Sequence, residues 1–279
     1  MSIMNGQKPD SLKRLLQSVP PGFVVDSPWL RANRIGRRSV YEYVKRGWLD
    51  RPASGVYRRP LPGRRTSDRV DWRRCVLSMQ HIMGYAVHVG AMSALALHGH
   101  SHYLPLGEKI LWLYGSGFPG WLTRLPLDVA LETRSTSLFS DPGIGLMQEQ
   151  AGQGSVVPAQ DWALKVSTPE RAVLEALDEL PDHESFHSLE MVFEGLATLR
   201  PRLLASLLEN CTSIKVKRLF FVFADYHDHA WRALLDPDSF YLGRGDRGLL
   251  KGGRIHPRYR IVVPEMYAQP RSGSRNRFV

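Results

Sequence analysis

The stretch from Ser27 to Arg59 most constrains what this chain can fold into, because two helical patterns and a hairpin pattern follow one another closely. Ser27 and Pro28 are residues favoured at a helix start, and a second helix is expected directly after Gly36. Apolar residues in this second helix recur at helical spacing, so one face is buried and the other is polar. The expected buried face comprises Val40, Tyr43, Val44 and Gly47, and the polar face comprises Arg38, Tyr41, Glu42 and Lys45.

A hairpin pattern follows the second helix. Gly47 ends the helix, because glycine readily adopts the left-handed conformation found at helix ends. Residues 48–49 begin an extended run, residues 52–55 (Pro-Ala-Ser-Gly) supply turn chemistry, and residues 56–58 return antiparallel. Two short helices and an arginine-rich hairpin predict a winged helix-turn-helix, in which the second helix reads DNA and the hairpin is the wing.

Positive charge is concentrated at the two ends of the chain. Residues 1–74 hold 17 Lys and Arg against 6 Asp and Glu, residues 75–243 hold 11 against 19, and residues 244–279 hold 9 against 2, within a total of +10. Because phosphate neutralisation supplies most non-specific affinity for DNA, the basic N-terminal part predicts DNA binding. The acidic middle either binds a basic protein partner or keeps the basic head from self-association.

Composition and length limit the class of protein. The hydrophobic fraction of 43% and the charged fraction of 23% are those of ordinary globular proteins. No apolar run approaches the roughly 20 residues of a membrane helix, and no signal-peptide pattern opens the chain, so we expect a cytoplasmic protein. Cys75 and Cys211 supply neither a disulfide framework nor a metal-ligand cluster.

The 279 residues predict about two domains. A linker rich in Pro, Gly and Arg at residues 61–67 separates an expected DNA-binding domain of residues 1–65 from a second domain of residues 66–279. We expect an α+β fold, in which an N-terminal winged helix-turn-helix precedes a mixed α/β C-terminal domain. The C-terminal domain carries a basic tail, which either adds nucleic-acid contacts or is a solvated hairpin.

Periodicity and turn residues predict the other elements of the chain. Helices are expected at residues 11–19, 70–84, 90–98, from 167 to 181, 188–199, 201–211 and 216–235. Strands are expected at residues 110–114 and 127–131, with a terminal β-meander at 241–242, 248–251 and 260–263. Residues 135–160 are expected to include irregular loops, and the tail from Gln269 to be disordered.

Short motifs in a fixed order match a known family. In the head they are Arg37-Arg38-Ser39-Val40-Tyr41, Arg46-Gly47-Trp48-Leu49 and Gly55-Val56-Tyr57. In the body they are Val89-Gly90, Ala94-Leu95, His98-Gly99, His102-Tyr103, Ser167-Thr168-Pro169-Glu170-Arg171-Ala172, Val216-Lys217-Arg218-Leu219-Phe220 and Lys251-Gly252-Gly253. Through them the chain resembles, over nearly its whole length, the AbiEi family of type IV toxin–antitoxin antitoxins.

This resemblance implies two activities. A winged-helix N-terminal domain represses its own operon by binding double-stranded operator DNA, and a C-terminal domain antagonises a nucleotidyltransferase-like toxin without a stable complex. One departure is Gly36, where many helix-turn-helix sequences carry a Ser or Thr cap, and glycine there costs only about a few tenths of a kcal/mol. A winged-helix regulator without a toxin partner is the alternative.

The second helix and the wing supply the expected DNA contacts. Arg37 and Arg38 are the first candidates, because arginine pairs bidentately with guanine and contributes about 1–3 kcal/mol of discrimination. Glu42 either accepts from cytosine or is the intrahelical partner of Arg38 or Arg46. The complete expected set is Arg37, Arg38, Ser39, Tyr41, Glu42, Lys45, Arg51, Arg58 and Arg59.

A metal site and an enzyme are the remaining readings. The histidines are arranged as His98, His100 and His102, and as His227 and His229 around Asp228, without the Cys or HExxH context of a strong metal signature. A nuclease would need Asp161, Lys165 and Glu170 to converge on one metal. The chain also lacks a phosphate-cradling glycine loop and a nucleophile elbow, so we expect no enzyme activity, no cofactor and no resident metal.

Overall fold

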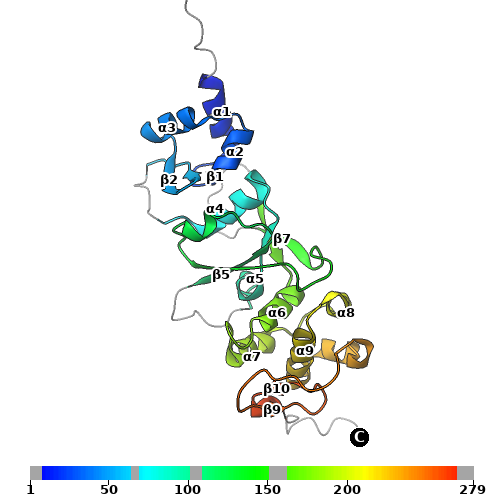
Figure 1. The fold of residues 1–279 in the computed structure, drawn as a ribbon. Coiled ribbons are helices and arrows are strands. Elements are labelled where there is room, and N and C mark those ends of the chain that lie inside the picture. The colour runs from blue at the N-terminus through cyan, green and yellow to red at the C-terminus, as the bar shows by residue number, and fades with distance from the viewer. Residues whose placement is uncertain (1–7, 64–68, 101–108, 151–161, 269–279) are drawn as a thin grey trace, which may run out of the picture. The chain divides into compact units, whose positions relative to one another are not determined.

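The computed structural model describes residues 8–63, 69–100, 109–150 and 162–268. Helices and strands are mixed along the chain, as the sequence predicts (Figure 1). The chain packs into two compact units, each made of separate segments. Unit 1 comprises Met1–His88, Gly107–Arg134 and Gln148–Lys165, and unit 2 comprises Val89–Leu106, Ser135–Met147 and Val166–Val279.

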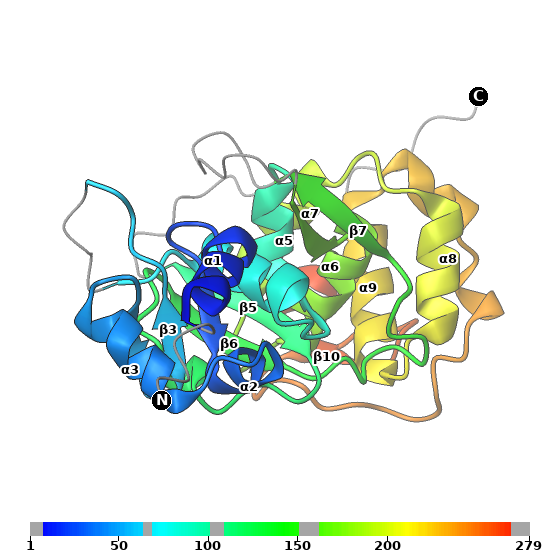
Figure 2. The same ribbon diagram turned by 90° about the horizontal axis from the view of Figure 1, so that it is seen from above.

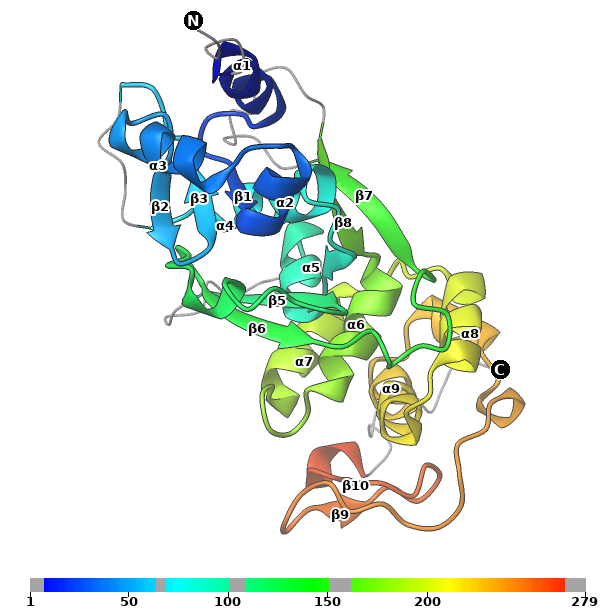
Figure 3. The ribbon, with the colours of Figure 1, turned by 45° about the horizontal axis from the view of Figure 1, so that its top comes forward.

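The first part of unit 1, residues 8–63, is the head. Its elements are α1 (Lys8–Ser18), β1 (Val24–Asp26), α2 (Ser27–Ala32), α3 (Arg37–Lys45), β2 (Asp50–Ala53) and β3 (Val56–Arg58). The strands form an antiparallel sheet in the order β1-β3-β2 (Figure 3). The expected helices and hairpin are present, but the first hairpin strand begins at Asp50 and not at residue 48.

Helix α2 is capped by Asp26, whereas the sequence predicts Ser27 as the cap. The Asp26 carboxylate accepts a hydrogen bond from the Trp29 amide at 2.9 Å, which satisfies one of the free donors at the helix start. Helix α3 begins after Gly36 as predicted, and of its side chains only Val40 and Tyr43 are buried. Gly47, with φ of 72°, lies exposed beyond the helix end and not on its buried face.

The rest of unit 1 differs from expectation in two places. The helix expected at residues 70–84 is α4 (Trp72–Leu77), which continues as a π-helix over Ser78–Ile82. Strand β5 (Ile110–Gly115) pairs in parallel with β6 (Ala130–Arg134), which begins later than expected. Leu127 forms an isolated bridge with Val70 instead, because the Asp128 amide donates to the Val70 carbonyl.

A second sheet has the strand order β6-β5-β4-β8-β7. Its further strands are β4 (Val87–Val89), β7 (Leu146–Gln150) and β8 (Ala163–Ser167), and β4 pairs in parallel with β8. Irregular loops were expected within residues 135–160, and residues 135–145 are indeed irregular, with turns and bends, apart from an isolated bridge at Phe139. Strand β7 follows them, and residues 151–160 lie outside the described residues.

Helices form the core of unit 2. They are α5 (Ala91–Leu97), α6 (Pro169–Asp178), α7 (Phe186–Gly195), α8 (Pro201–Asn210) and α9 (Ile214–His227). Helix α6 packs against α5, α8 and α9, and Figure 2 shows it between α5 and α9. The helix expected to run to residue 235 ends earlier, because Asp228 adopts a left-handed conformation and a 3-10 helix follows at Ala230–Leu234.

The expected β-meander after α9 is reduced to two short strands, β9 (Arg254–Ile255) and β10 (Val262–Val263), which pair antiparallel. The Arg218 guanidinium of α9 donates to the carbonyls of Leu242, Gly245 and Arg260. One side chain thus holds three points of this segment, and the Arg260 carbonyl also accepts from the Arg247 amide. The tail from Gln269 lies outside the described residues.

Every helix in the described ranges is too short or too polar to span a lipid bilayer.

Candidate nucleic-acid interface

Helix α3 presents a polar face to solvent. Arg37, Arg38 and Lys45 are exposed, and Tyr41 is 65% exposed. On the opposite side, the Tyr43 hydroxyl lies 2.8 Å from the Ser11 hydroxyl of α1 and forms a buried hydrogen bond with it. This bond and the buried Val40 fix the rotation of α3, so the sequence-predicted polar face is the face that solvent reaches.

A groove of about 320 Å³, here called the arginine groove, lies between α2, α3 and the β2–β3 hairpin. Figure 3 shows α3 beside this hairpin. Three exposed arginines from three elements line it, above a largely apolar floor, and its lining contains no carboxylate. The lining residues are Ser27, Leu30, Arg31, Ile35, Arg37, Val40, Tyr41, Val44, Arg51 and Tyr57.

A second groove of about 280 Å³ lies on the other side of α3 and is called the mixed groove. It is lined by Leu12, Arg38, Ser39, Glu42, Tyr43, Arg46 and Trp48. Glu42 Oε2 lies 3.8 Å from Arg46 Nε. Of the two intrahelical partners that the sequence suggests for Glu42, Arg38 and Arg46, the structure therefore pairs it with Arg46. Arg37 and Arg38, adjacent in sequence, therefore line different grooves.

Arg51 is exposed on the β2–β3 hairpin, where two contacts hold its side chain. Its Nη2 donates to the Ser54 hydroxyl at 3.1 Å, and its guanidinium lies 6.0 Å from the centroid of the Tyr57 ring. Both contacts lie within the hairpin, so they limit the directions in which the guanidinium can point.

Arg58 and Arg59, also expected to contact DNA, bind inside the chain instead. The Arg58 guanidinium forms an ion pair with Asp50 at 2.9 Å and donates to the Arg69 carbonyl. Arg59 donates to the carbonyls of Leu16 and Val19 at the end of α1, and burial lowers its pKa. These contacts argue against the phosphate contacts expected from the sequence, and they give both side chains a positioning role.

The histidines that suggested a metal site make separate contacts. His98 Nε2 lies 2.8 Å from the Ser167 carbonyl oxygen, and His229 Nε2 lies 2.6 Å from that of Phe193. His227 stacks on the Phe193 ring, and His102 lies outside the described residues. Among the residues that the structure describes, no three His, Cys, Asp or Glu side chains are grouped so that they could hold a metal ion.

The residues considered for a nuclease site do not converge on one site among the described residues. Glu170 is 2% exposed and forms two side-chain hydrogen bonds with Arg200, each 2.9 Å long. Burial raises the pKa of Glu170, but the bonds from Arg200 outweigh it and leave the pKa below its ordinary value. Lys165 is exposed, and Asp161 lies outside the described residues.

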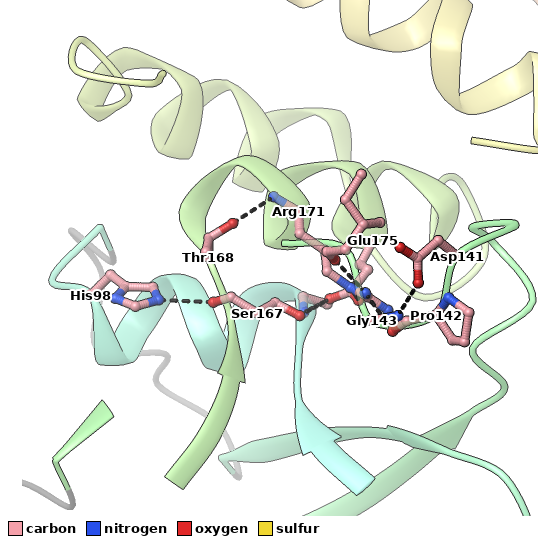
Figure 4. A network of polar contacts seen from close by, with 10 residues as sticks. His98, Asp141, Pro142, Gly143, Ser167, Thr168, Arg171 and Glu175 are labelled. Carbon is pink, nitrogen blue, oxygen red and sulfur yellow. Dashed lines mark hydrogen bonds and ion pairs between the residues drawn. The ribbon is translucent and has the colours of Figure 1, made fainter. Parts of the chain in front are cut away.

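A buried polar network occupies unit 2 (Figure 4). Arg171 and Glu175 of α6 are both fully buried and form an ion pair at 2.7 Å. Arg171 also donates to the carbonyls of Pro142 and Ile144, while Glu175 accepts from the Ser167 hydroxyl and the Ala91 amide. The network ties α5 and a loop to α6.

Comparisons with known proteins cover both parts of the chain. A family model described as "Transcriptional regulator, AbiEi antitoxin N-terminal domain" matches residues 8–106. A second model, "Transcriptional regulator, AbiEi antitoxin, Type IV TA system", matches residues 108–264. The crystal structure of RV2827C protein from Mycobacterium tuberculosis is similar in fold, with a TM-score of 0.54 and 13% identity over 94% of this chain and 92% of that chain. No curated protein matches the chain.

Proposed function

The chain belongs to the AbiEi family of transcriptional regulators and antitoxins of type IV toxin–antitoxin systems, and from this premise we propose that it represses its own operon by binding operator DNA. The head, within residues 1–65, acts as a winged helix-turn-helix. Helix α3 is the recognition helix, and the β2–β3 hairpin is the wing. The observation that carries this proposal is the exposed, arginine-rich face of α3 beside a groove whose lining contains no carboxylate.

The DNA contacts are proposed for side chains that reach solvent from α3 and the wing. Arg38 lies in the first turn of α3, from which a recognition helix reaches base edges, and it reads guanine. Lys45, near the end of the helix, contacts phosphate. The proposed set is Arg37, Arg38, Ser39, Tyr41, Glu42, Lys45 and Arg51, in which Glu42 exchanges its exposed ion pair with Arg46 for a cytosine amino group. Arg58 and Arg59 leave this set, because their guanidinium groups bind within the head.

The second proposed activity is neutralisation of a nucleotidyltransferase-like toxin, without a stable complex, by residues 66–279. Family membership as an antitoxin supports it. The chain acts as a regulator and not as an enzyme. Co-expression with the nucleotidyltransferase encoded beside it is the test: the full chain should restore growth, and the head alone should not. Growth arrest despite the full chain would leave a regulator without a toxin partner.

Arg38→Ala tests base reading by α3. We expect it to lower affinity for the operator by about tenfold to a hundredfold and to change affinity for scrambled DNA little, because one bidentate contact contributes about 1–3 kcal/mol of discrimination. Gel-shift titrations on both duplexes measure the ratio. Arg202→Ala, an exposed arginine of α8, is the matched control and should leave both affinities unchanged. Equal losses on both duplexes for Arg38→Ala would remove Arg38 from the base-reading set.

A further inference from the structure

We propose that the arginine groove seats one sugar–phosphate strand of the DNA, and that Arg31, which the sequence did not single out, contacts its phosphates. This inference rests on the proposed function and deepens it. It also assigns Arg37 to the phosphate backbone, which separates its role from that of Arg38.

The path of the strand follows from the geometry of a duplex. A recognition helix lies in the major groove, and a wing reaches the minor groove beside it. Those two grooves are separated by one sugar–phosphate strand, so that strand must pass between the helix and the wing. In this head, the space between α3 and the β2–β3 hairpin is the arginine groove.

The lining of the groove suits such a strand. Arg31 of α2, Arg37 of α3 and Arg51 of β2 are all exposed, and they bring three arginine side chains from three different elements to the groove. Guanidinium pairs with phosphate through two parallel hydrogen bonds, and no carboxylate in the lining competes for these donors. The tyrosine hydroxyls of Tyr41 and Tyr57 add two further donors.

The floor of the groove suits the sugar. Val44 and the Tyr57 ring are half-buried and form an apolar surface between the arginines, above the buried Leu30, Ile35 and Val40. Deoxyribose is the less polar part of the sugar–phosphate backbone, so its C–H edges can rest on this surface while the phosphates face the arginines. An apolar floor below charged rims therefore matches the alternation of sugar and phosphate along the strand.

The mixed groove on the other side of α3 lacks this match. Glu42 lies in it beside Arg46, and a carboxylate would repel a phosphate at close range. Arg46 nevertheless resembles Arg31 in solvent exposure: its side chain is 71% exposed, and Arg31 is exposed as well. Arg46→Ala is therefore a matched control, with the same chemical change on the same helix-turn-helix segment but outside the proposed strand path.

Fluorescence-anisotropy titrations of the full chain on operator and scrambled duplexes, at a series of salt concentrations, test the inference. We expect weaker binding to both duplexes for each of three variants, Arg31→Ala, Arg37→Ala and Arg51→Ala. For each, the plot of log affinity against log salt should become less steep by about 0.9, the value for one lost phosphate contact. Arg46→Ala should keep the wild-type slope. Circular dichroism spectra would establish that each variant is folded.

Uncharged methylphosphonate links, placed one at a time along each operator strand, give a second readout. At the position that faces Arg31, the substitution should weaken the wild type and leave Arg31→Ala unchanged, because that contact is already lost. An unchanged salt slope for Arg31→Ala, or an equal fall for Arg46→Ala, would overturn the inference while the proposed function stands. A wild-type chain that binds no duplex would overturn both.

Discussion

At the scale of single residues, the Arg171–Glu175 pair tests what holds unit 2 together. Glu175→Gln keeps the shape of the side chain and leaves the fully buried Arg171 without its counter-charge. We expect a loss of about 3–5 kcal/mol in the free energy of unfolding, the usual cost of breaking a buried pair from one side. Urea denaturation measures it, with Glu209→Gln, on the exposed surface of α8, as the control. A change below about 0.5 kcal/mol, the range of surface substitutions, would contradict this account.

Glu184 gives a pH dependence at the same scale. Burial and the nearby charge of Glu179 raise the pKa of Glu184 to about 7. The folded chain therefore binds the proton of the Glu184 carboxyl group more tightly than the unfolded chain does. The protonated group contributes its full stability below pH 4.5, and this stability is lost as pH rises through about 7. Glu184→Gln should therefore stabilise the protein at pH 8 and have little effect at pH 4. Thermal melts at both values check this, and an effect independent of pH would contradict it.

At the scale of elements, the segment after α9 depends on one side chain. Arg218 donates to three carbonyls in this segment, and burial lowers its pKa, which marks it as a guanidinium taken out of water. Arg218→Met keeps the aliphatic length and removes the three bonds. We expect faster hydrogen exchange at residues 242–263 and unchanged exchange in the head. Exchange that rises equally in both regions would indicate general destabilisation instead.

The helices and strands are easier to predict from the sequence than the contacts that their side chains make. The predicted buried face of α3 is confirmed at Val40 and Tyr43, because helical periodicity is a local property, and it is wrong at Gly47, which lies beyond the helix end. Arg58 is expected from its charge to contact DNA, although strand alternation places it on the same side as the buried Val56 and so indicates burial. Arg31 was missed because its meeting with Arg37 and Arg51 arises only when α2, α3 and the hairpin pack together.

At the scale of the whole molecule, Asp26 decides how independent the head is. Its carboxylate caps α2 and also accepts from the Tyr85 hydroxyl at 2.6 Å and the Trp121 indole at 3.2 Å, both beyond the head but within unit 1. The Ser78 hydroxyl accepts from the Val24 amide in the same way. The head therefore shares its interior with later parts of unit 1.

Two fragments test this dependence. A fragment of residues 1–65 lacks all three partners of β1, whereas residues 1–134 keep Ser78, Tyr85 and Trp121. We expect the longer fragment to melt at a clearly higher temperature and to bind the operator more tightly. Circular dichroism melts and gel shifts compare them, and equal melting temperatures would mean that the head folds without these contacts.

Trp48, on the rim of the mixed groove, gives the protein an optical reporter of its own. It is 43% exposed, whereas the other six tryptophans are buried or half-buried. Acrylamide in solution therefore quenches the fluorescence of Trp48 more strongly than that of the other tryptophans. Arg38, the proposed base reader, lines the same groove, so operator DNA that reaches Arg38 should shield Trp48, and the quenching constant should fall as DNA is added. Trp48→Phe should abolish this response, so the unlabelled chain can report its own occupancy by DNA.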